Sequence, residues 1–299
     1  MEPLRKILVT GASGFVGKHL VRGLCEAGYQ VVGLVRENSD TRALPQLPDC
    51  HLYYLEGGLE KLFFDFEIQG IIHTATSYGK SGLLSEVLET NLVLPVKLIE
   101  AGISRGLQFF INTDTFFTKS SGTYQYLNQY TQSKQFFMKA LEGYRGKIKC
   151  INFKLEHVYG EGDGDSKFVT QILRRLLANE PAIDLTDGLQ RRDFIYVKDV
   201  VSAYRTILEK LPVLDDYTEL EVGTGESVSI RQFTETAKKL TTSTSVLNFG
   251  ALATRPGEFS ESKADNERLR ILGWRPTFNL TQGLTKIITH EKSIRNDTN

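Results

Sequence analysis

The stretch "VTGASGFVGKHL", residues 9–20, decides the fold. It joins an apolar, β-branched run to a helix-like segment, and three glycines fall in the turn between them. Glycines lack a Cβ atom, so backbone N–H groups and the helix N-terminus can approach a pyrophosphate. The spacing G-x-x-G-x-x-G departs from the G-x-G-x-x-G of ordinary dinucleotide dehydrogenases, but its place between a strand and a helix predicts a dinucleotide-binding turn. The expected cofactor contacts in this turn are Gly11, Ser13, Gly14, Phe15, Val16 and Gly17.

Short apolar runs alternate with longer segments of helical period as far as Gly160. Examples are "QVVGLVR" (30–36), "IQGIIHTAT" (68–76) and "QFFINTD" (108–114). This alternation is typical of βαβ units and predicts an α/β fold with a doubly wound parallel sheet, the Rossmann arrangement. Beyond Gly160 the rhythm changes. We therefore predict a dinucleotide-binding domain over residues 1–160, rejoined by about 192–218, and a smaller C-terminal α/β substrate lobe over the rest of 161–299.

The composition favours an enzyme with a small-molecule substrate. Lys plus Arg and Asp plus Glu both count 36 in 299 residues, which excludes the basic footprint of a nucleic-acid binder. The three cysteines, Cys25, Cys50 and Cys150, are odd in number and widely spaced, so we expect partly buried thiols in a reducing compartment and no metal site. The start of the chain has no room for a signal peptide, and no run approaches a membrane span, so we expect a cytoplasmic protein.

The choice of cofactor depends on Arg36, the last residue of the second strand-like run. NAD enzymes usually place an acidic residue there to bind the ribose hydroxyls. A guanidinium can instead hold a 2′-phosphate, which a carboxylate would repel, so NADP(H) is favoured. Glu37 and Asp40 follow closely and keep NAD(H) open, and Arg36 could also be an ordinary solvated charge.

The stretch "NTDTFFTKSSGTYQYLNQYTQSK", residues 112–134, contains a candidate for proton transfer. Tyr130 and Lys134 are four residues apart on a helical segment, so they share a face, and the ammonium group can lower the pKa of the phenol. Such a tyrosine can exchange a proton with a carbonyl or alcohol oxygen while hydride moves at a nicotinamide. Thr113, at the end of the preceding strand, would hydrogen-bond the same oxygen. The alternative is an ordinary pair of helix neighbours.

Over almost its entire length the chain resembles the extended short-chain dehydrogenase/reductase family of nucleotide-sugar enzymes. The resemblance rests on a series of motifs in order: "TGASGFVG", "HTAT", "TNLVLPVKLIEA", "YTQSK", "EHVYGEGD", "GLQRRDFIYVKDV", "VGTGES", "RPGE" and "LGWRPT". It implies an NAD(P)H-dependent oxidoreductase with a Rossmann domain, a C-terminal lobe that holds a nucleoside diphosphate sugar, and commonly a homodimer.

The resemblance also implies roles for individual residues. Asn91 would support the lysine and its water. Arg192 and Arg255 would meet the diphosphate or ribose, because the planar guanidinium binds phosphate in a bidentate manner; either could instead be paired with Asp193 or Glu258. Further cofactor contacts are expected from Thr74, Ala75, Thr76, Tyr130, Lys134 and Leu155, and substrate contacts from Thr115, His157, Lys167, Phe168, Arg192, Arg255 and Glu258. His157 stands where many relatives have Asn, so a purely structural role is the alternative.

Dehydratases, epimerases and reductases of this family share the Thr-Tyr-Lys core, so the neighbouring residues must distinguish them. Dehydratases follow the threonine with Asp-Glu, whereas this chain reads Thr113-Asp114-Thr115 and lacks the second carboxyl group. Dehydratases and epimerases also keep a resident NAD, against the indication of Arg36. A 4-ketoreductase consuming NADPH remains. Asp114 could contact a sugar hydroxyl or the nicotinamide carboxamide, or could cap the local turn.

Within the family the chain looks most like the CDP-paratose and CDP-abequose synthases. These enzymes reduce the 4-keto group of a CDP-3,6-dideoxyhexulose for surface polysaccharide synthesis. A dTDP, UDP or GDP sugar stays open as the substrate. The alternatives in function are a 4-epimerase or 4,6-dehydratase, and, in another class, a non-catalytic NADP-binding regulatory protein.

Overall fold

The computed structural model describes residues 6–44, 48–119 and 126–297, which form two compact units. Unit 1 is drawn from Met1–Ser120, Leu127–Lys154 and Tyr204–Leu220, and unit 2 from Ser121–Tyr126, Leu155–Ala203 and Glu221–Asn299. The predicted rejoining segment, about 192–218, overlaps the return of the chain to unit 1, and its residues 192–203 belong to unit 2. The assignment of cofactor to one part and substrate to the other stays a prediction.

Unit 1 is built on a seven-stranded sheet in the order β11-β6-β5-β4-β1-β2-β3. Its strands are β1 (Lys6–Thr10), β2 (Gln30–Val35), β3 (Cys50–Tyr54), β4 (Gly70–His73), β5 (Phe109–Thr115), β6 (Lys149–Leu155) and β11 (Tyr217–Val222). The pairings of β1 with β2 and β4, of β2 with β3 and of β4 with β5 are parallel. The predicted Rossmann sheet is therefore confirmed. The strand order reverses between β1 and β4, which is where such sheets bind ligands at their carboxyl edge.

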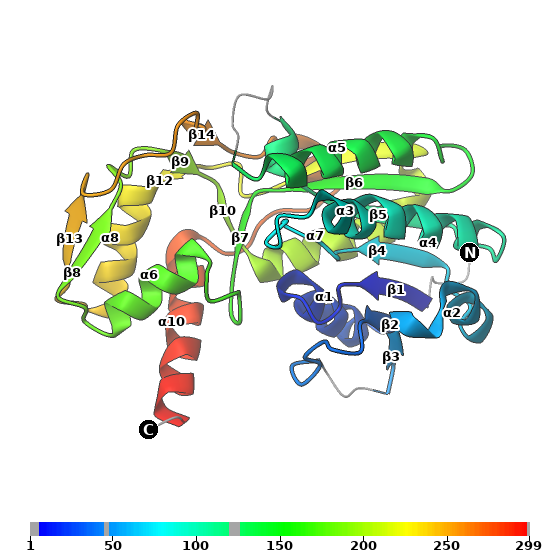
Figure 1. The fold of residues 1–299 in the computed structure, drawn as a ribbon, viewed down its shortest axis with the longest axis horizontal. Coiled ribbons are helices and arrows are strands. Elements are labelled where there is room, and N and C mark those ends of the chain that lie inside the picture. The colour runs from blue at the N-terminus through cyan, green and yellow to red at the C-terminus, as the bar shows by residue number, and fades with distance from the viewer. Residues whose placement is uncertain (1–5, 45–47, 120–125, 298–299) are drawn as a thin grey trace. The chain divides into compact units, whose positions relative to one another are not determined.

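Helices cover this sheet because its central strands are apolar on both faces. On one face, side chains of α2 (Leu59–Asp65), α4 (Leu94–Ile103) and α5 (Asn128–Glu142) pack against the strands in one buried cluster. Figure 1 shows α3 (Leu84–Leu88), α4 and α5 gathered along one side of the sheet. The remaining helical segments of unit 1 are α1 (Phe15–Glu26), η1 (Leu55–Gly57), the π-helical turn η2 (Glu89–Val93), η3 (Phe116–Lys119) and η4 (Leu211–Val213). Helix α7 (Val197–Lys210) enters unit 1 at Tyr204.

Unit 2 combines short strands with helices. Strand β10 (Phe194–Tyr196) pairs with β7 (His157–Tyr159), β13 (Val246–Phe249) pairs with β8 (Ala182–Leu185), and β9 (Arg191–Arg192) lies between β12 (Val228–Ser229) and β14 (Glu261–Ser262). Helices α6 (Phe168–Leu177), α8 (Ile230–Thr241) and α10 (Leu280–Asp297) contact one another, and α9 (Glu267–Ile271) is short. Aromatic rings form part of the core, with the centroids of Phe194 and Phe233 4.2 Å apart. The expected smaller α/β lobe is present.

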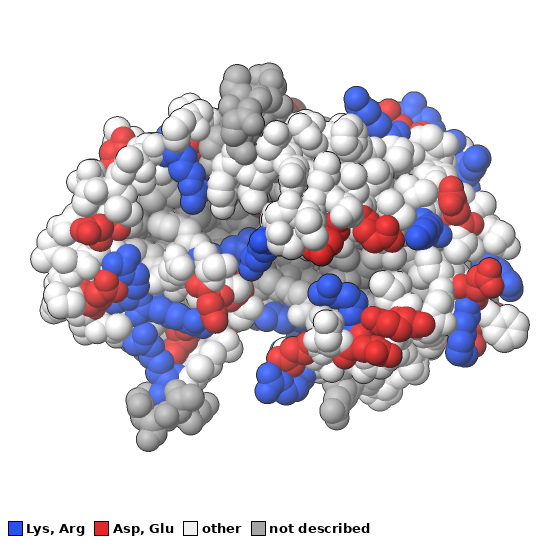
Figure 2. Space-filling view, in the orientation of Figure 1, with Lys and Arg blue, Asp and Glu red and all other residues white. Residues whose placement is uncertain are grey.

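The surface carries charges of both signs. On the face drawn in Figure 2, acidic and basic side chains are interspersed, without a broad field of one sign. Among the helices that the structure describes, none is long and apolar enough to cross a membrane.

Candidate active site

The glycine turn lies at the carboxyl end of β1 and closes tightly onto its surroundings. Gly11 has φ +62°, and a Cβ atom there would lie 2.7 Å from the Cα atom of Ala75. A Cβ atom on Gly17 would lie 2.1 Å from the carbonyl oxygen of Gly11. Helix α1 starts directly after Gly14, with no side-chain cap and no acidic residue in its first turn. Its first N–H groups therefore suit an anion, and the turn fits the pyrophosphate of a dinucleotide.

The end of β4 is tied to this turn. The Thr10 side chain and His73 Nδ1 form a hydrogen bond of 2.8 Å, and the Ala75 N–H donates to Thr10 Oγ1 over 3.2 Å. The Thr74 hydroxyl donates to the carbonyl oxygen of Thr10 over 2.6 Å. Burial lowers the pKa of His73 well below its usual value, and the charge of Lys134 acts in the same direction. Thr10, at the start of the turn, thus connects it to His73, Thr74 and Ala75.

Tyr130 and Lys134 are both buried on α5. The Lys134 ammonium donates to the carbonyl oxygen of Thr113 over 2.8 Å and to Thr76 Oγ1 over 3.2 Å. Burial lowers the pKa of Lys134 to about 8, against the opposing effect of Asp114. Three of the predicted site residues, Thr76, Thr113 and Lys134, are thereby brought together.

The expectation that the ammonium lowers the phenol pKa is wrong for this structure. Burial raises the pKa of Tyr130 well above its usual value, with smaller contributions in the same direction from Tyr78 and Asp114. A hydrogen bond with the Thr115 side chain acts in the opposite direction. Lys134 Nζ lies 6.0 Å from the centroid of the Tyr130 ring. Desolvation therefore outweighs the helix-neighbour effect, and Tyr130 is protonated at neutral pH.

Asn91 lies in the π-helical turn η2, fully buried, and connects that turn to α5. Its amide donates to the carbonyl oxygen of Ser77 and to Ser133 Oγ, each over 2.9 Å, and its oxygen accepts from the Ser77 N–H over 2.8 Å. Ser133 in turn donates to the carbonyl oxygen of Tyr130 over 2.7 Å. Asn91 thus anchors the helix that carries Tyr130 and Lys134, and its predicted support of the lysine through a water stays a prediction.

Thr113 and Thr115 have different partners. The Thr113 hydroxyl hydrogen-bonds the phenol of Tyr204 over 2.6 Å, whereas the Thr115 side chain bonds Tyr130. The two threonines flank Asp114 on β5. The two threonine hydroxyls therefore bond different tyrosines of unit 1.

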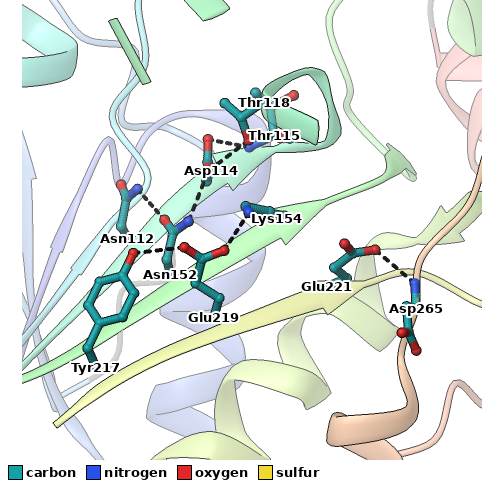
Figure 3. Close-up of polar contacts among 10 residues, drawn as sticks. All are labelled: Asn112, Asp114, Thr115, Thr118, Asn152, Lys154, Tyr217, Glu219, Glu221 and Asp265. Carbon is teal, nitrogen blue, oxygen red and sulfur yellow. Dashed lines mark hydrogen bonds and ion pairs between the residues drawn. The ribbon is translucent and has the colours of Figure 1, made fainter. Parts of the chain in front are cut away.

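Asp114 caps the end of β5, which was one of its predicted alternatives. Its carboxylate accepts from the Thr115 N–H over 2.8 Å, and from Thr118 Oγ1 and Asn152 Nδ2 over 3.0 Å each. Asn112 donates to the oxygen of Asn152 over 2.7 Å, so the two amides form a chain of hydrogen bonds that ends at the carboxylate (Figure 3). Burial raises the pKa of Asp114, and the Asn152 bond and the Lys134 charge act in the opposite direction.

In unit 2, Arg192 and Glu258 form an ion pair, which was the alternative to a ligand role for this arginine. The guanidinium of Arg192 is buried and donates to Glu258 Oε1 over 2.7 Å and to the carbonyl oxygens of Arg191 and Phe259 over 2.8 Å each. The guanidinium carbon of Arg255 lies 4.1 Å from the centroid of the Tyr126 ring. Of the two arginines predicted to meet the diphosphate or ribose, Arg192 is thus paired with Glu258.

His157, on β7, is half-buried and neutral. Burial lowers its pKa to about 3, and the charges of Arg192 and Lys167 act in the same direction. Lys167 is the N-cap residue of α6 and Phe168 its first residue, with the Phe168 ring centroid 5.7 Å from that of Phe233. These predicted substrate ligands therefore lie near one another in unit 2. Leu155, a predicted cofactor contact, is buried at the end of β6.

Arg36 is exposed directly after β2. Of the two acidic residues that kept NAD(H) open, Asp40 is held by Arg42, whose side-chain nitrogens donate to it over 2.9 and 2.7 Å. The backbone N–H of Glu37 donates a hydrogen bond to Glu56 Oε2 over 3.3 Å. The binding of an adenosine phosphate by the exposed guanidinium of Arg36 stays a prediction.

Metal ligands were not expected, and within the described ranges no group of three or more His, Cys, Asp or Glu side chains could hold a metal ion. The thiols of Cys25 and Cys50 are half-buried neighbours, and Cys150 is buried. Burial raises the pKa of Cys25 to about 12, which makes it a poor metal ligand or nucleophile.

A model of the NAD dependent epimerase/dehydratase family matches residues 7–223, from β1 to the end of β11. The chain belongs to this family. The match runs from the glycine turn through the Tyr130–Lys134 helix and ends after the strand that completes the sheet. The chain is thus a member of a group of NAD(P)-dependent nucleotide-sugar oxidoreductases and epimerases.

The similarity to curated proteins extends over nearly the full chain. The chain is 37% identical to CDP-abequose synthase of Salmonella typhimurium, over 94% of its own length and 97% of that protein. It is 27% identical to dTDP-4-dehydro-6-deoxyglucose reductase of Escherichia coli, over 97% of each chain. The similarity therefore extends over both units.

Solved structures of the epimerase/dehydratase family have the same fold. UDP-glucose 4-epimerase of Thermotoga maritima with UDP-glucose matches with a TM-score of 0.85 at 25% identity, over 97% of this chain and 99% of that one. UDP-glucuronic acid 4-epimerase of Bacillus cereus, in complex with UDP-glucuronic acid and NAD, matches with a TM-score of 0.82 at 25% identity, over the same shares. These homologues bind nucleotide sugars, and the second binds NAD.

The candidate site also contains residues that the sequence did not single out. Thr10 and His73 lie inside two of the recognised motifs, so their strand-end positions could have suggested them. Tyr204 and Asn152 lie in runs that resemble ordinary buried helix and strand, and their partners are 91 and 38 residues away. Sequence spacing carries no signal for such pairs.

The buried carboxylate gives a testable expectation for pH dependence. In Asp114→Asn the negative charge that favours protonated Lys134 is gone, so the pKa of Lys134 falls below about 8. Because the proposed reaction needs the ammonium, the fall of kcat/KM at alkaline pH then begins at a lower pH than in the wild type. The loss of kcat/KM relative to the wild type should be roughly threefold larger at pH 8 than at pH 6.5. Glu219→Gln removes a carboxylate that pairs with Lys154 on the same sheet and is the control. An unchanged alkaline limb in Asp114→Asn would refute the coupling.

Proposed function

We propose that the protein is an NADPH-dependent 4-ketoreductase that converts the 4-keto group of a nucleoside diphosphate deoxyhexulose to an alcohol. CDP-4-keto-3,6-dideoxyglucose is the proposed substrate, and CDP-abequose or CDP-paratose the product, for surface polysaccharide synthesis. The substrate class is supported by the 37% identity to CDP-abequose synthase over nearly both whole chains.

The observation that carries the proposal is the group beside Tyr130. The residue after Asp114 is Thr115, and its hydroxyl bonds the Tyr130 phenol. Water elimination from a sugar needs separate groups for its proton transfers, and Asp114 is occupied by three donors. A ketone reduction needs only one acid. The protonated phenol of Tyr130 is that acid.

In the proposed reduction, each residue of the site has a separate role. Tyr130 gives its proton to the carbonyl oxygen of the ketone, and Thr113 donates a hydrogen bond to the same oxygen. Lys134, protonated below about pH 8, places a positive charge beside the phenolate that forms. NADPH held by these residues would supply the hydride for the reduction. Asn91 holds α5 in place, and solvent returns the proton to Tyr130.

The remaining assignments of the proposal are these. The cofactor is bound by the glycine turn, by residues 74–76, by Tyr130 and Lys134, by Leu155 and by Arg36. The sugar nucleotide is bound by Thr115, His157, Lys167, Phe168, Arg192, Arg255 and Glu258. In the proposed complex, Arg192 or Glu258 leaves the ion pair that joins them in the structure and binds the ribose or diphosphate. Because members of the resembled family are commonly dimeric, we also propose a homodimer, which sedimentation of the purified protein tests.

The direct test is the loss of NADPH absorbance when the purified enzyme meets CDP-4-keto-3,6-dideoxyglucose. NADH and a dTDP-4-keto-6-deoxy sugar are run in parallel. Rapid oxidation with the CDP substrate supports the proposal, and NMR of the product then gives the configuration at C4. Absence of oxidation with both sugars and both cofactors refutes it in favour of an epimerase or dehydratase with resident NAD.

Cofactor choice is tested at Arg36. In Arg36→Ala the guanidinium that would hold the 2′-phosphate is lost, and the KM for NADPH is expected to rise about 10-fold, the value of a charged hydrogen bond. The KM for NADH should stay within about twofold, since NADH lacks that phosphate. Arg42→Ala is the matched control, because Arg42 is an exposed arginine six residues away that is paired with Asp40. An equal rise for both cofactors in Arg36→Ala would count against a phosphate contact.

A further inference from the structure

Thr113 is held by a tyrosine that no motif pointed to. Tyr204, on the part of α7 that belongs to unit 1, has its phenol oxygen 2.6 Å from Thr113 Oγ1. Tyr204 is fully buried, and its ring packs on Phe153 of β6 with the centroids 4.7 Å apart. The ring is therefore fixed by its neighbours, and the phenol points at one partner.

The direction of this hydrogen bond decides what Thr113 can do. A threonine hydroxyl has a single hydrogen and two lone pairs. If that hydrogen went to Tyr204, Thr113 would have only lone pairs left for a substrate, and a ketone oxygen accepts but does not donate. If Tyr204 donates instead, the Thr113 hydrogen stays available for the ketone.

The phenol is the better donor of the two. A phenol is far more acidic than an aliphatic hydroxyl, so it gives its hydrogen more readily in a bond between them. Burial raises the pKa of Tyr204, so the phenol keeps its proton over the working pH range, although the bond to Thr113 acts slightly in the other direction. A neutral Tyr204 is thus a permanent donor toward β5.

We propose that Tyr204 is a positioning residue that donates its hydrogen bond to Thr113 and thereby directs the Thr113 hydroxyl hydrogen toward the substrate's carbonyl oxygen. This role rests on the proposed function, since it requires that Thr113 bind the ketone. The Thr113 backbone is held independently, because its carbonyl oxygen accepts from Lys134 over 2.8 Å. With the backbone held by Lys134 and one lone pair of the hydroxyl taken by Tyr204, the hydroxyl hydrogen is kept away from the phenol.

The test is a double-mutant cycle with Tyr204→Phe, Thr113→Val and the double variant. Phenylalanine keeps the ring in its place on Phe153 and removes only the hydroxyl. We expect Tyr204→Phe to lower kcat about 10-fold, with the KM values for sugar and NADPH within about twofold. Thr113→Val should lower kcat about 100-fold. The double variant should be no slower than Thr113→Val alone, because the phenol has nothing left to orient.

A second background separates positioning from support of the fold. Serine lacks the methyl group that restricts rotation of the threonine side chain, so it depends more on an external partner. In Thr113→Ser the loss caused by Tyr204→Phe is therefore expected to exceed 10-fold. Tyr217→Phe is the matched control, because it removes another phenol of unit 1 that bonds Glu219 over 3.0 Å. Thermal unfolding of each variant reports folding separately from kcat.

The outcomes distinguish this inference from the proposed function. The positioning role is overturned if the losses are additive in the double variant, or if Tyr204→Phe keeps full turnover while Thr113→Val is slow. Either result leaves the proposed reductase function standing. Full turnover in Thr113→Val overturns the role of Thr113 and that of Tyr204 with it. Three results together support the inference. Tyr204→Phe alone is slow, its loss is not additive with that of Thr113→Val, and its loss is larger in the Thr113→Ser background than in the wild type.

Discussion

The Tyr130→Phe enzyme is expected to keep most of its affinity for NADPH, since one contact of many is lost, and to lose about 100- to 10,000-fold of its turnover, the range for a removed general acid. The phenol is the group that burial keeps protonated in the proposed site. Phenylalanine preserves the ring, which lies 4.9 Å from the ring of Tyr78, so the local packing survives. The measurements are kcat from NADPH absorbance and the Kd of NADPH from fluorescence quenching.

Tyr144→Phe is the control for this variant. Tyr144 follows α5 and its phenol bonds Glu100 over 3.3 Å, so the substitution removes a tyrosine hydroxyl from the same region. Its kcat should match that of the wild type. A turnover within threefold of wild type in Tyr130→Phe itself would eliminate Tyr130 as the acid.

Lys134→Ala is expected to weaken both steps, with a loss of about 100-fold in kcat and about 10-fold in NADPH affinity. The ammonium donates to the Thr113 carbonyl and to Thr76 Oγ1, so its removal leaves a carbonyl oxygen of β5 without that donor and loosens residues expected to contact the cofactor. It also removes the positive charge that stabilises the phenolate of Tyr130 in the proposed reaction.

The pH profile gives Lys134 a signature of its own. Because its pKa is about 8 in the free protein, the ammonium is present below that pH and is lost above it. The wild-type kcat/KM should therefore fall as the pH rises through about 8, and the residual activity of Lys134→Ala should lack this limb. Lys139→Ala, on the exposed side of α5, is the control and should keep the limb. A limb that persists in Lys134→Ala belongs to another group.

The sequence was sufficient for the fold because local signals determine it. The glycine turn between a strand and a helix, and the alternation that follows, predict the parallel sheet without any long-range information. The strand order then follows the Rossmann pattern, and it brings residues 74–76 to the turn as expected. Thr113, Tyr130 and Lys134 are near one another in sequence, so their grouping on β5 and α5 was also predictable.

The protonation and the hydrogen-bond partners of the site residues were less predictable, because they depend on burial and on residues far away in the sequence. Spacing indicates that Lys134 is a neighbour of Tyr130, but not that both are desolvated, and desolvation reverses the expected shift of the phenol pKa. The choice between a capping and a ligand role for Asp114 depends on Asn152, on another strand. Likewise, Arg192 meets Glu258 from 66 residues away.

The connection between the glycine turn and the end of β4 has a consequence for evolution. Thr10, His73 and Ala75 are joined by hydrogen bonds, and Gly11 has no room for a side chain against Ala75. A change at one of these positions therefore alters the space or the hydrogen bonds available to the others, although more than 60 residues separate Thr10 from His73 and Ala75. Homologous chains should show correlated substitutions at positions 10, 73 and 75, with the two strand ends inherited as a single unit.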